Sequence, residues 1–298
     1  MKEEKWILYS LVFQLKSPLH IGYHKIMHLT RTRLYVPART LWGAMTVKLV
    51  QKTGRNDYKK AGQFLREKMR FGYFYFSNGK ELFLPHYTEE GLKLGRMCLY
   101  EFEKKYIRSI STTAIDANSL SAEEETLHHL EYINYRNTED SSPLFLEGLM
   151  WIKIDGHPKE DDFLFTYEDV QVKLSELLQS LQIGGERKYG FGETELVKLE
   201  RLDDTDLRSK GFCGSWLESD ESVKVKILQG DFIWAHAKYE PNLNMKGEIE
   251  IFMGREWDDK KGSGRNIVTY GLCWVPGSIV EEQATFEITP SGIWEVYK

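Results

Sequence analysis

The chain has 298 residues, of which 41% are hydrophobic and 29% charged, and its formal net charge at pH 7 is −5. This composition excludes extensive disorder, and the length predicts two domains of ordinary size. Three widely spaced cysteines argue against a disulfide framework and favour a reducing cytoplasm, and no apolar run or secretory leader points to a membrane.

Hydrophobic periodicity and turn residues predict the elements of the first 200 residues. In chain order these are a strand over 6–15, a long loop over 16–33, a helix that starts at Pro37 and a second helix over 57–70. A β-hairpin over 71–84, an irregular insertion over about 86–143, a strand over 144–154, a helix over 169–182 and a strand over 193–200 follow.

Without the insertion, this order is close to the β-α-β-β-α-β order of a ferredoxin-like domain. We therefore expect an α+β protein, with a ferredoxin-like (RRM-like) domain over 1–200 that contains the insertion. Short alternating runs predict a β-rich C-terminal domain over 201–298, and one interpretation makes it a degenerate second ferredoxin-like unit. RNA-recognition modules use the ferredoxin-like fold, but a fold alone does not establish RNA binding.

A glycine-rich stretch over 184–192 has the composition of a site for single-stranded nucleic acid. Arg187 and Lys188 suit phosphates, Tyr189 can stack on an unpaired base, and four glycines permit close backbone approach: Gly184, Gly185, Gly190 and Gly192. The predicted helix before the stretch would place it at a helix C-terminus, where the dipole disfavours anions. Binding would then depend on side chains and exposed loop amides. The alternative is an ordinary glycine-rich turn.

A cationic strip over residues 16–60 stands out from the acidic balance of the chain. It holds ten Lys or Arg residues against a single acid, which indicates an electrostatic footprint on one face. Within it, Arg31, Arg33 and Arg39 predict a phosphate clamp. The alternative is a solvated basic surface.

His20, His24 and His28 are spaced by four residues, but neither cysteine nor acid accompanies them, so we predict no metal site and no cofactor. A loop that lies over an RNA backbone fits them better. Each histidine is also an alternative general base for RNA cleavage, because imidazole titrates near neutrality. Asp116 is an alternative metal-binding acid for phosphodiester cleavage, and its more ordinary role is to cap a turn.

Three motifs, taken in order, resemble the RAMP superfamily of CRISPR-associated proteins. They are SPLHIG at residues 17–22, YVPARTLWGA at residues 35–44 and GGERKYGFG at residues 184–192. Residues 113–127 are also similar to a stretch of type III subunits, with Thr126 in place of a glycine. The long C-terminal part with WVPGS at residues 274–278 resembles the type III-D subunit that caps the guide at its 5′ handle.

The resemblance implies a non-catalytic guide (crRNA)-binding subunit of a type III effector complex, acting in antiviral defence. Its partners would be guide RNA, the large signalling subunit and the backbone RAMP subunits, and His20 would stack or hydrogen-bond at the site. One alternative is a RAMP endonuclease that processes CRISPR transcripts with a histidine base. Others are a backbone subunit that cuts target RNA with Asp116 and a metal, and an adaptor without RNA contact.

Overall fold

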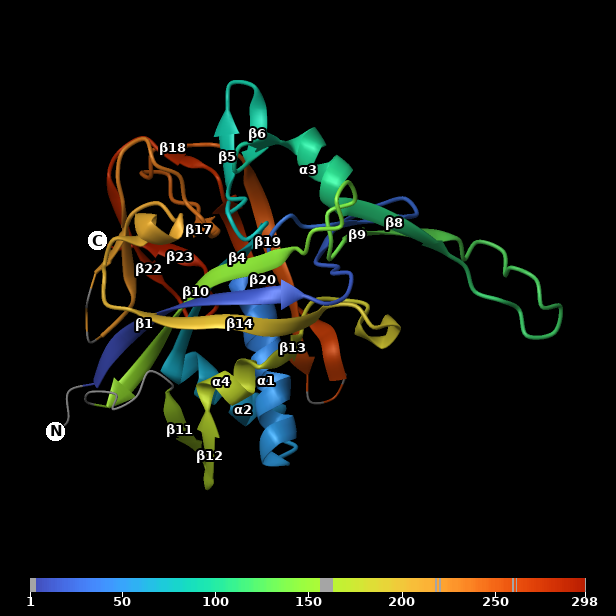
Figure 1. Cartoon of the computed structure of the whole chain (residues 1–298), viewed down its shortest axis with the longest axis horizontal. Coiled ribbons are helices and arrows are strands. Elements are labelled where there is room, and N and C mark those ends of the chain that lie inside the picture. The colour runs from blue at the N-terminus through green and yellow to red at the C-terminus, as the bar shows by residue number, and fades with distance from the viewer. Residues whose placement is uncertain are drawn as a thin grey trace.

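A computed structural model describes residues 4–155, 163–217, 219, 221–258, 260 and 262–297, and it is organised around a five-stranded antiparallel sheet (Figure 1). The order in this sheet is β13-β14-β1-β10-β4. The bounds are β1 Glu4–Leu15, β4 Met69–Ser77, β10 Phe145–Asp155, β13 Ser180–Gln182 and β14 Glu193–Leu202. The predicted strands over 6–15, 144–154 and 193–200 are confirmed. Two of them, β1 and β10, pair along nearly their whole length.

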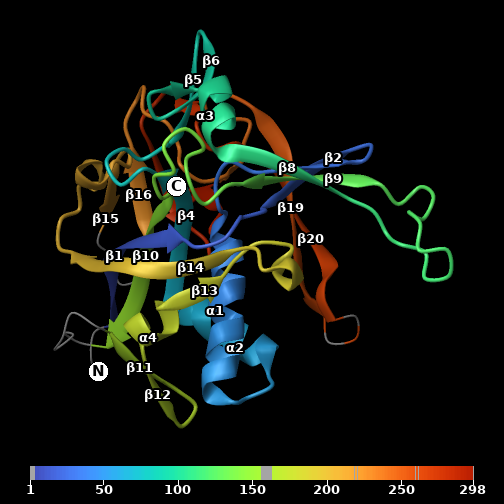
Figure 2. The same ribbon diagram turned by 45° about the vertical axis from the view of Figure 1, so that its right-hand side comes forward.

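Helices α1 (Ala38–Thr53) and α2 (Tyr58–Lys68) lie on one side of the sheet (Figure 2). Pro37 is the residue before α1, where its fixed φ suits a helix start. Asp57 caps α2, because its carboxylate accepts a hydrogen bond from the Lys60 backbone N–H at 2.9 Å. Both predicted helices are confirmed.

The predicted helix over 169–182 is wrong. The segment forms β12 (Val170–Lys173), the single helical turn α4 (Leu174–Leu178) and β13, and β12 pairs with β11 (Leu164–Tyr167). Its leucines have helical spacing, but the valines of β12 alternate toward the core and pair in a hairpin. The glycine-rich stretch therefore joins two paired strands, and the expected repulsion of anions by a helix C-terminus does not apply.

The predicted loop over 16–33 is also wrong, because it contains the hairpin β2 (Gly22–Ile26) and β3 (Leu29–Thr32). All five residues of β2 are exposed, so no hydrophobic alternation marks it as a strand. Strand β3 pairs in parallel with β9 (His128–Ile133), and β9 pairs with β8 (Ile107–Thr112). The result is a four-stranded sheet in the order β2-β3-β9-β8.

The insertion is ordered rather than irregular. It holds a small sheet and a short helix: β5 Pro85–Thr88, β6 Gly91–Leu94, β7 Met97–Cys98 and α3 Leu99–Tyr106. Strands β8 and β9 follow and project from the rest of the molecule (Figures 1 and 2). The predicted hairpin before the insertion is present in short form, since Ser77 bridges Leu82 across the turn at Asn78 and Gly79.

The C-terminal part is β-rich, as predicted. Its seven-stranded sheet has the order β15-β16-β22-β23-β17-β20-β19. The bounds are β15 Ser215–Leu217, β16 Lys224–Ile227, β17 Ala237–Lys238, β19 Ile249–Asp258, β20 Gly262–Trp274, β22 Ala284–Ile288 and β23 Trp294–Val296, beside the pair β18 Met245–Lys246 and β21 Ile279–Val280. Among the described residues after 202, the one helical segment is the 3₁₀ turn η2 (Leu207–Lys210). The helices that a second ferredoxin-like unit requires are therefore not found there.

One apolar core joins the two parts of the chain. Trp234 of the C-terminal part stacks on Trp151 of β10, with ring centroids 6.4 Å apart. The Tyr75 hydroxyl of β4 donates a hydrogen bond to the Trp234 carbonyl. A single cluster of buried hydrophobic residues includes members of both parts, so the predicted domains share one core.

A buried polar network crosses the same boundary. His236 is fully buried, accepts a hydrogen bond from the Tyr73 hydroxyl (2.7 Å) and donates one to the Glu250 carboxylate. Arg33 donates to Glu250 at 2.8 Å and to the Tyr35 hydroxyl at 2.9 Å. Burial lowers the pKa of His236 to about 4, so its contact with Glu250 is a hydrogen bond from a neutral imidazole. Burial opposes ionisation of Glu250, but its hydrogen bond from His236 and the charge of Arg33 lower its pKa to about 2.

This network predicts acid sensitivity. The unfolded imidazole titrates near 6.5 and the folded one near 4, so the unfolded chain binds more protons between these values and stability falls as the pH drops through this window. Between pH 7 and pH 4.5, the unfolding free energy measured with urea should fall by about 2 kcal/mol less in His236→Gln than in the wild type. His24→Gln, at an exposed histidine, should leave the loss unchanged. Equal acid sensitivity in the wild type and His236→Gln would contradict this reading of the network.

Candidate functional site

The glycine-rich loop (residues 184–192) is the connection between β13 and β14, and its glycines fit tight backbone contacts. At Gly184 (φ +80°) a Cβ would lie 2.4 Å from the His20 carbonyl oxygen, and at Gly192 (φ +83°) it would lie 1.8 Å from that of Ile183. The N–H groups of Gly185 and Gly192 donate to the carbonyls of the 17–22 segment, at 2.8 Å and 2.7 Å. Gly190 also has positive φ, but the space around it is open. Two of the motifs therefore pack directly against each other.

The tip of this loop is exposed. A 3₁₀ turn, η1 (Arg187–Tyr189), presents both cations and Tyr189, which is 79% exposed. Phe191 turns inward and packs edge-on against Tyr132, with ring centroids 5.5 Å apart. The Gln182 amide nitrogen donates to the backbone carbonyls of Arg187 and Phe191, both at 3.0 Å, which fastens the loop to β13. Cationic and aromatic side chains thus point outward from a braced loop.

Beside the loop lies a groove of about 640 Å³ between α1 and the edge formed by β13 and β14. Three cations line it: Lys16, Lys48 and Arg187. Three side-chain amides (Gln51, Gln179 and Gln182), two carboxylates (Glu193 and Glu195) and smaller side chains complete its walls. The cationic strip and the glycine-rich loop, which lie far apart in the sequence, therefore meet at one concave surface.

The charges of the groove differ in their availability. Lys16 lies 2.6 Å from the Glu195 carboxylate. Lys48 contacts the Ser180 hydroxyl at 3.1 Å, and neither it nor Arg187 forms an ion pair within the described part of the chain. Lys48 and Arg187 can therefore bind phosphates, and neighbouring amides can hydrogen-bond base edges. Such a groove suits a short single strand of nucleic acid.

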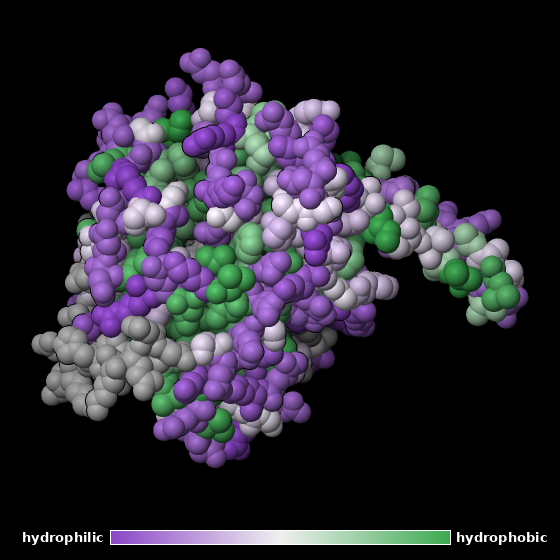
Figure 3. All heavy atoms as spheres, in the orientation of Figure 1, coloured by the Kyte–Doolittle hydropathy of each residue, from purple (hydrophilic) through white to green (hydrophobic). Residues whose placement is uncertain are grey.

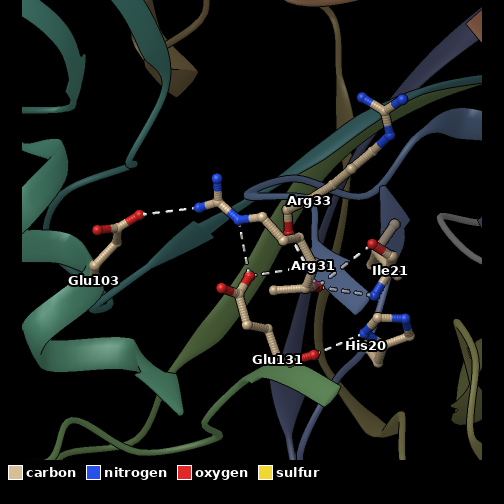
Figure 4. Close-up of polar contacts among 7 residues, drawn as sticks. His20, Ile21, Arg31, Arg33, Glu103 and Glu131 are labelled. Atoms are coloured by element: carbon tan, nitrogen blue, oxygen red, sulfur yellow. Dashed lines mark hydrogen bonds and ion pairs between the residues drawn. The ribbon is translucent and has the colours of Figure 1, made fainter. Parts of the chain in front are cut away.

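His20 is buried and stabilises the glycine-rich loop. Its ring is buried, its Nδ1 lies 2.7 Å from the Glu131 carbonyl oxygen, and burial lowers its pKa (Figure 4). Its own carbonyl accepts the Gly185 N–H. His24 and His28 are exposed on the β2–β3 hairpin, and His24 packs on Tyr23 with ring centroids 3.7 Å apart. No metal-binding group of His, Cys, Asp or Glu occurs among the described residues.

The three arginines of the predicted clamp do not converge on the loop. Arg31 lies 3.4 Å from Glu103 and 3.3 Å from Glu131, and its guanidinium points away from that of Arg33 (Figure 4). Arg33 is buried in the network with Glu250.

The third member, Arg39, has a side chain that is only 9% exposed. It donates to the Arg255 carbonyl at 2.9 Å and lies 3.5 Å from the Glu256 carboxylate. Buried, paired guanidinium groups are poorly placed for phosphates, so Arg33 and Arg39 hold the C-terminal part instead.

Asp116 lies at the tip of the β8–β9 hairpin. Its carboxylate accepts hydrogen bonds from the N–H groups of Asn118 (3.0 Å) and Ser119 (2.7 Å) and from the Ser119 hydroxyl. These hydrogen bonds, those from Ser119 foremost, lower the pKa of Asp116. The side chain is a turn cap in this structure.

Most residues of the groove were not predicted from the sequence. Lys16 and Lys48 belong to the cationic strip but were not among the expected site residues. The one available signal was the i, i+3 pair Lys48 and Gln51 on the polar side of α1. Gln179 carried no such signal, because the segment that contains it was predicted as a helix rather than as the approach to an edge strand.

The sequence model of one family matches residues 12–195, more than half of the chain: the RAMP superfamily. The chain belongs to the RAMP superfamily. The matched region begins within β1, includes α1 and ends three residues after the glycine-rich loop, so it contains the whole groove.

Solved structures that resemble this RAMP protein include two of a type III-B complex. One is a chain of the type III-B Cmr-β complex bound to cognate target RNA, with a TM-score of 0.51 and 11% identity over 91% of this chain and 86% of that one. The other, from the complex with target RNA and AMPPnP, has the same coverage, 12% identity and a TM-score of 0.49. At such identity the first likeness shows the fold. A comparison with curated proteins found no match, and no described helix is long and apolar enough to cross a bilayer.

Proposed function

We propose that this RAMP protein is a guide-RNA-binding subunit of a type III CRISPR effector complex in the cytoplasm. The observation that carries the proposal is the convergence of Lys16, Lys48 and Arg187 on one groove beside the glycine-rich loop. In guide-dependent complexes base pairing reads the sequence, while the protein holds the backbone. A groove with Lys48, Arg187 and side-chain amides, next to a loop that exposes Tyr189, fits that task.

We further propose that the subunit grips the 5′-handle region of the guide without cutting it. Two of the four candidate catalytic groups have structural roles, since His20 braces the loop and Asp116 caps a turn. The other two, His24 and His28, are exposed on the β2–β3 hairpin. The sheet contains the strand order β14-β1-β10-β4, and helices α1 and α2 lie between β1 and β4 in the sequence. This arrangement supports a ferredoxin-like core as the platform. The large signalling subunit and backbone RAMP subunits are its proposed neighbours.

The groove predicts a specific loss of RNA affinity. Replacing Lys48 and Arg187 together with alanine should weaken binding of a single-stranded guide about tenfold or more. It should also lower the salt slope by roughly 1.4, since each phosphate contact in a single strand contributes about 0.7. Titrations of labelled guide at several salt concentrations measure both quantities.

A matched control is Lys80→Ala, which removes an exposed cation from the β-turn after β4. It should change neither affinity nor salt slope. Unchanged binding by the Lys48/Arg187 double variant would rule the groove out as the contact. Cleavage of a repeat RNA by the wild-type protein, lost on substitution of His20, His24 or His28, would instead favour a processing enzyme. Metal-dependent cutting of target RNA that is lost in Asp116→Ala would favour a backbone nuclease.

A further inference from the structure

Strands β13 and β14 present side chains to the groove in facing pairs. Gln182 lies opposite Glu193, Ser180 lies opposite Glu195, and all four residues line the groove. Directly opposed side chains share one face of a sheet, with Cβ atoms about 5 Å apart. Hydrophilic residues predominate on the surface around α4 and β13 (Figure 3, in the orientation of Figure 1). One end of this wall therefore carries an amide and a carboxylate side by side.

The Gln182 side chain offers a ligand only an acceptor. Its amide nitrogen donates to the carbonyls of Arg187 and Phe191, both at 3.0 Å, so both of its N–H groups are in use. A side-chain amide has two N–H donors and one carbonyl oxygen, which accepts. The two hydrogen bonds to the loop therefore fix the orientation of the amide and leave its oxygen, Oε1, for another molecule.

Glu193 is a carboxylate without a cation. Its neighbour on the same face, Glu195, lies 2.6 Å from the Lys16 ammonium group, whereas Glu193 is exposed and pairs with no Lys or Arg among the residues that the structure describes. The Glu193 backbone is held on both sides, since its N–H donates to the Ser17 hydroxyl at 2.9 Å and its carbonyl accepts the Lys16 N–H at 2.8 Å. An unbalanced carboxylate repels phosphates, so it weakens RNA binding unless it accepts hydrogen bonds from a base.

Adjacent acceptors select a base with adjacent donors. Bases of a single strand expose their Watson–Crick edges, and the edge of guanine carries the N1–H and the N2 amino group next to each other. Adenine and cytosine each place a ring-nitrogen acceptor beside their amino group, and uracil places its one N–H between two carbonyl oxygens. A carboxylate can accept both guanine donors at once, whereas each of the other bases sets an acceptor against it.

We propose that Glu193 and Gln182 read one guanine base of the bound strand. The Glu193 carboxylate accepts the N1–H and one hydrogen of the N2 amino group, and the Gln182 oxygen accepts the other. The inference rests on the proposed function, because the groove must hold RNA for a base to reach this wall. Lys48 and Arg187 contact phosphates of any sequence, and the wall adds the choice of base.

Titrations of the full chain with short labelled RNA strands test the choice of base. Guanine is placed at each position of a uracil strand in turn, and at the best position it should strengthen binding at least about tenfold over uracil alone. Adenine or cytosine there should add less. Inosine, which lacks the N2 amino group, should lose part of the gain, and 7-deazaguanine, which keeps both donors, should bind like guanine. Equal binding of guanine and inosine would overturn the proposed contact with the amino group.

Glu193→Gln separates base reading from a structural role. It should lose the preference for guanine, because the new N–H group replaces an acceptor with a donor. It should also bind the all-uracil strand more tightly than the wild type does, because a repulsion of phosphates is removed. A merely structural residue would weaken both strands alike. The matched control Glu89→Gln, at an exposed glutamate in the turn between β5 and β6, should leave both affinities unchanged.

The Lys48/Arg187 double variant shows which proposal fails if the expected preference is not found. If this variant binds every strand more weakly while the wild type prefers no base, the groove holds RNA and only the guanine assignment is overturned. If the variant binds every strand as tightly as the wild type, RNA is held elsewhere, and the groove and the guanine assignment are both overturned. A guanine preference that persists in Glu193→Gln would also overturn the assignment.

Discussion

Replacing Gly192 with alanine is expected to destabilise the fold by about 3 kcal/mol or more, whereas the same change at Gly190 is expected to cost about 1 kcal/mol. Both residues have a left-handed backbone, with φ of +83° and +79°. They differ in space: a Cβ on Gly192 would lie 1.8 Å from the Ile183 carbonyl oxygen, while nothing lies within 4 Å of one on Gly190. Of these two substitutions, only the one at Gly192 therefore adds the free-energy cost of a steric clash to the cost of the left-handed backbone.

Urea unfolding of the two variants measures this difference directly. The Ile183 carbonyl belongs to the segment that joins β13 to the loop, so relief of the clash must move the backbone that presents Arg187. Gly192→Ala should therefore also weaken guide binding in the fraction that folds, and Gly190→Ala should bind almost normally. Equal stability losses at the two positions would show that φ alone, not the packing of the loop, requires glycine.

Arg33→Met is expected to destabilise the fold by about 3 to 5 kcal/mol, because it leaves a carboxylate buried without its cation. The Glu250 side chain is only 12% exposed, and its remaining partner, His236, is neutral. Adding Glu250→Gln removes the uncompensated charge, and the new amide oxygen can still accept the His236 N–H. The double variant should therefore recover at least half of the loss.

Unfolding free energies of the two single variants and the double variant form the cycle that isolates this coupling. The salt slope of guide binding by Arg33→Met should match the wild type, since this arginine faces the C-terminal part. A loss below about 1 kcal/mol in Arg33→Met would contradict the buried ion pair. A lower salt slope of guide binding with unchanged stability would instead indicate that Arg33 contacts RNA.

The sequence correctly predicted the elements that begin or end at a distinctive residue such as proline, or whose hydrophobic residues recur with a clear periodicity. Pro37 placed the start of α1, and continuous apolar runs placed β1, β4 and β10. Failures occurred where the period was ambiguous or missing. The leucines around α4 mimic a helix although only one turn is helical, and β2 shows no alternation because both of its faces are exposed. Tertiary pairing decided both segments.

The site was predicted in part for a similar reason. The loop residues Arg187, Lys188 and Tyr189 are exposed as expected, because short-range glycine chemistry fixes that turn. The carboxylates that pair with Arg33 and Arg39 lie more than 200 residues later in the chain, so no local pattern indicates them. The groove likewise depends on the packing of α1 against β13, and only the fold brings its cations together.

A nucleotide-resolution map of crosslinks between this chain and RNA, in the assembled guide-loaded complex, tests the central claim most directly. We predict crosslinks from α1 around Lys48 and from the loop around Arg187 to the 5′ part of an intact guide. Guide contacts confined to the C-terminal sheet, or to neighbouring subunits alone, would contradict the claim that this groove holds the strand.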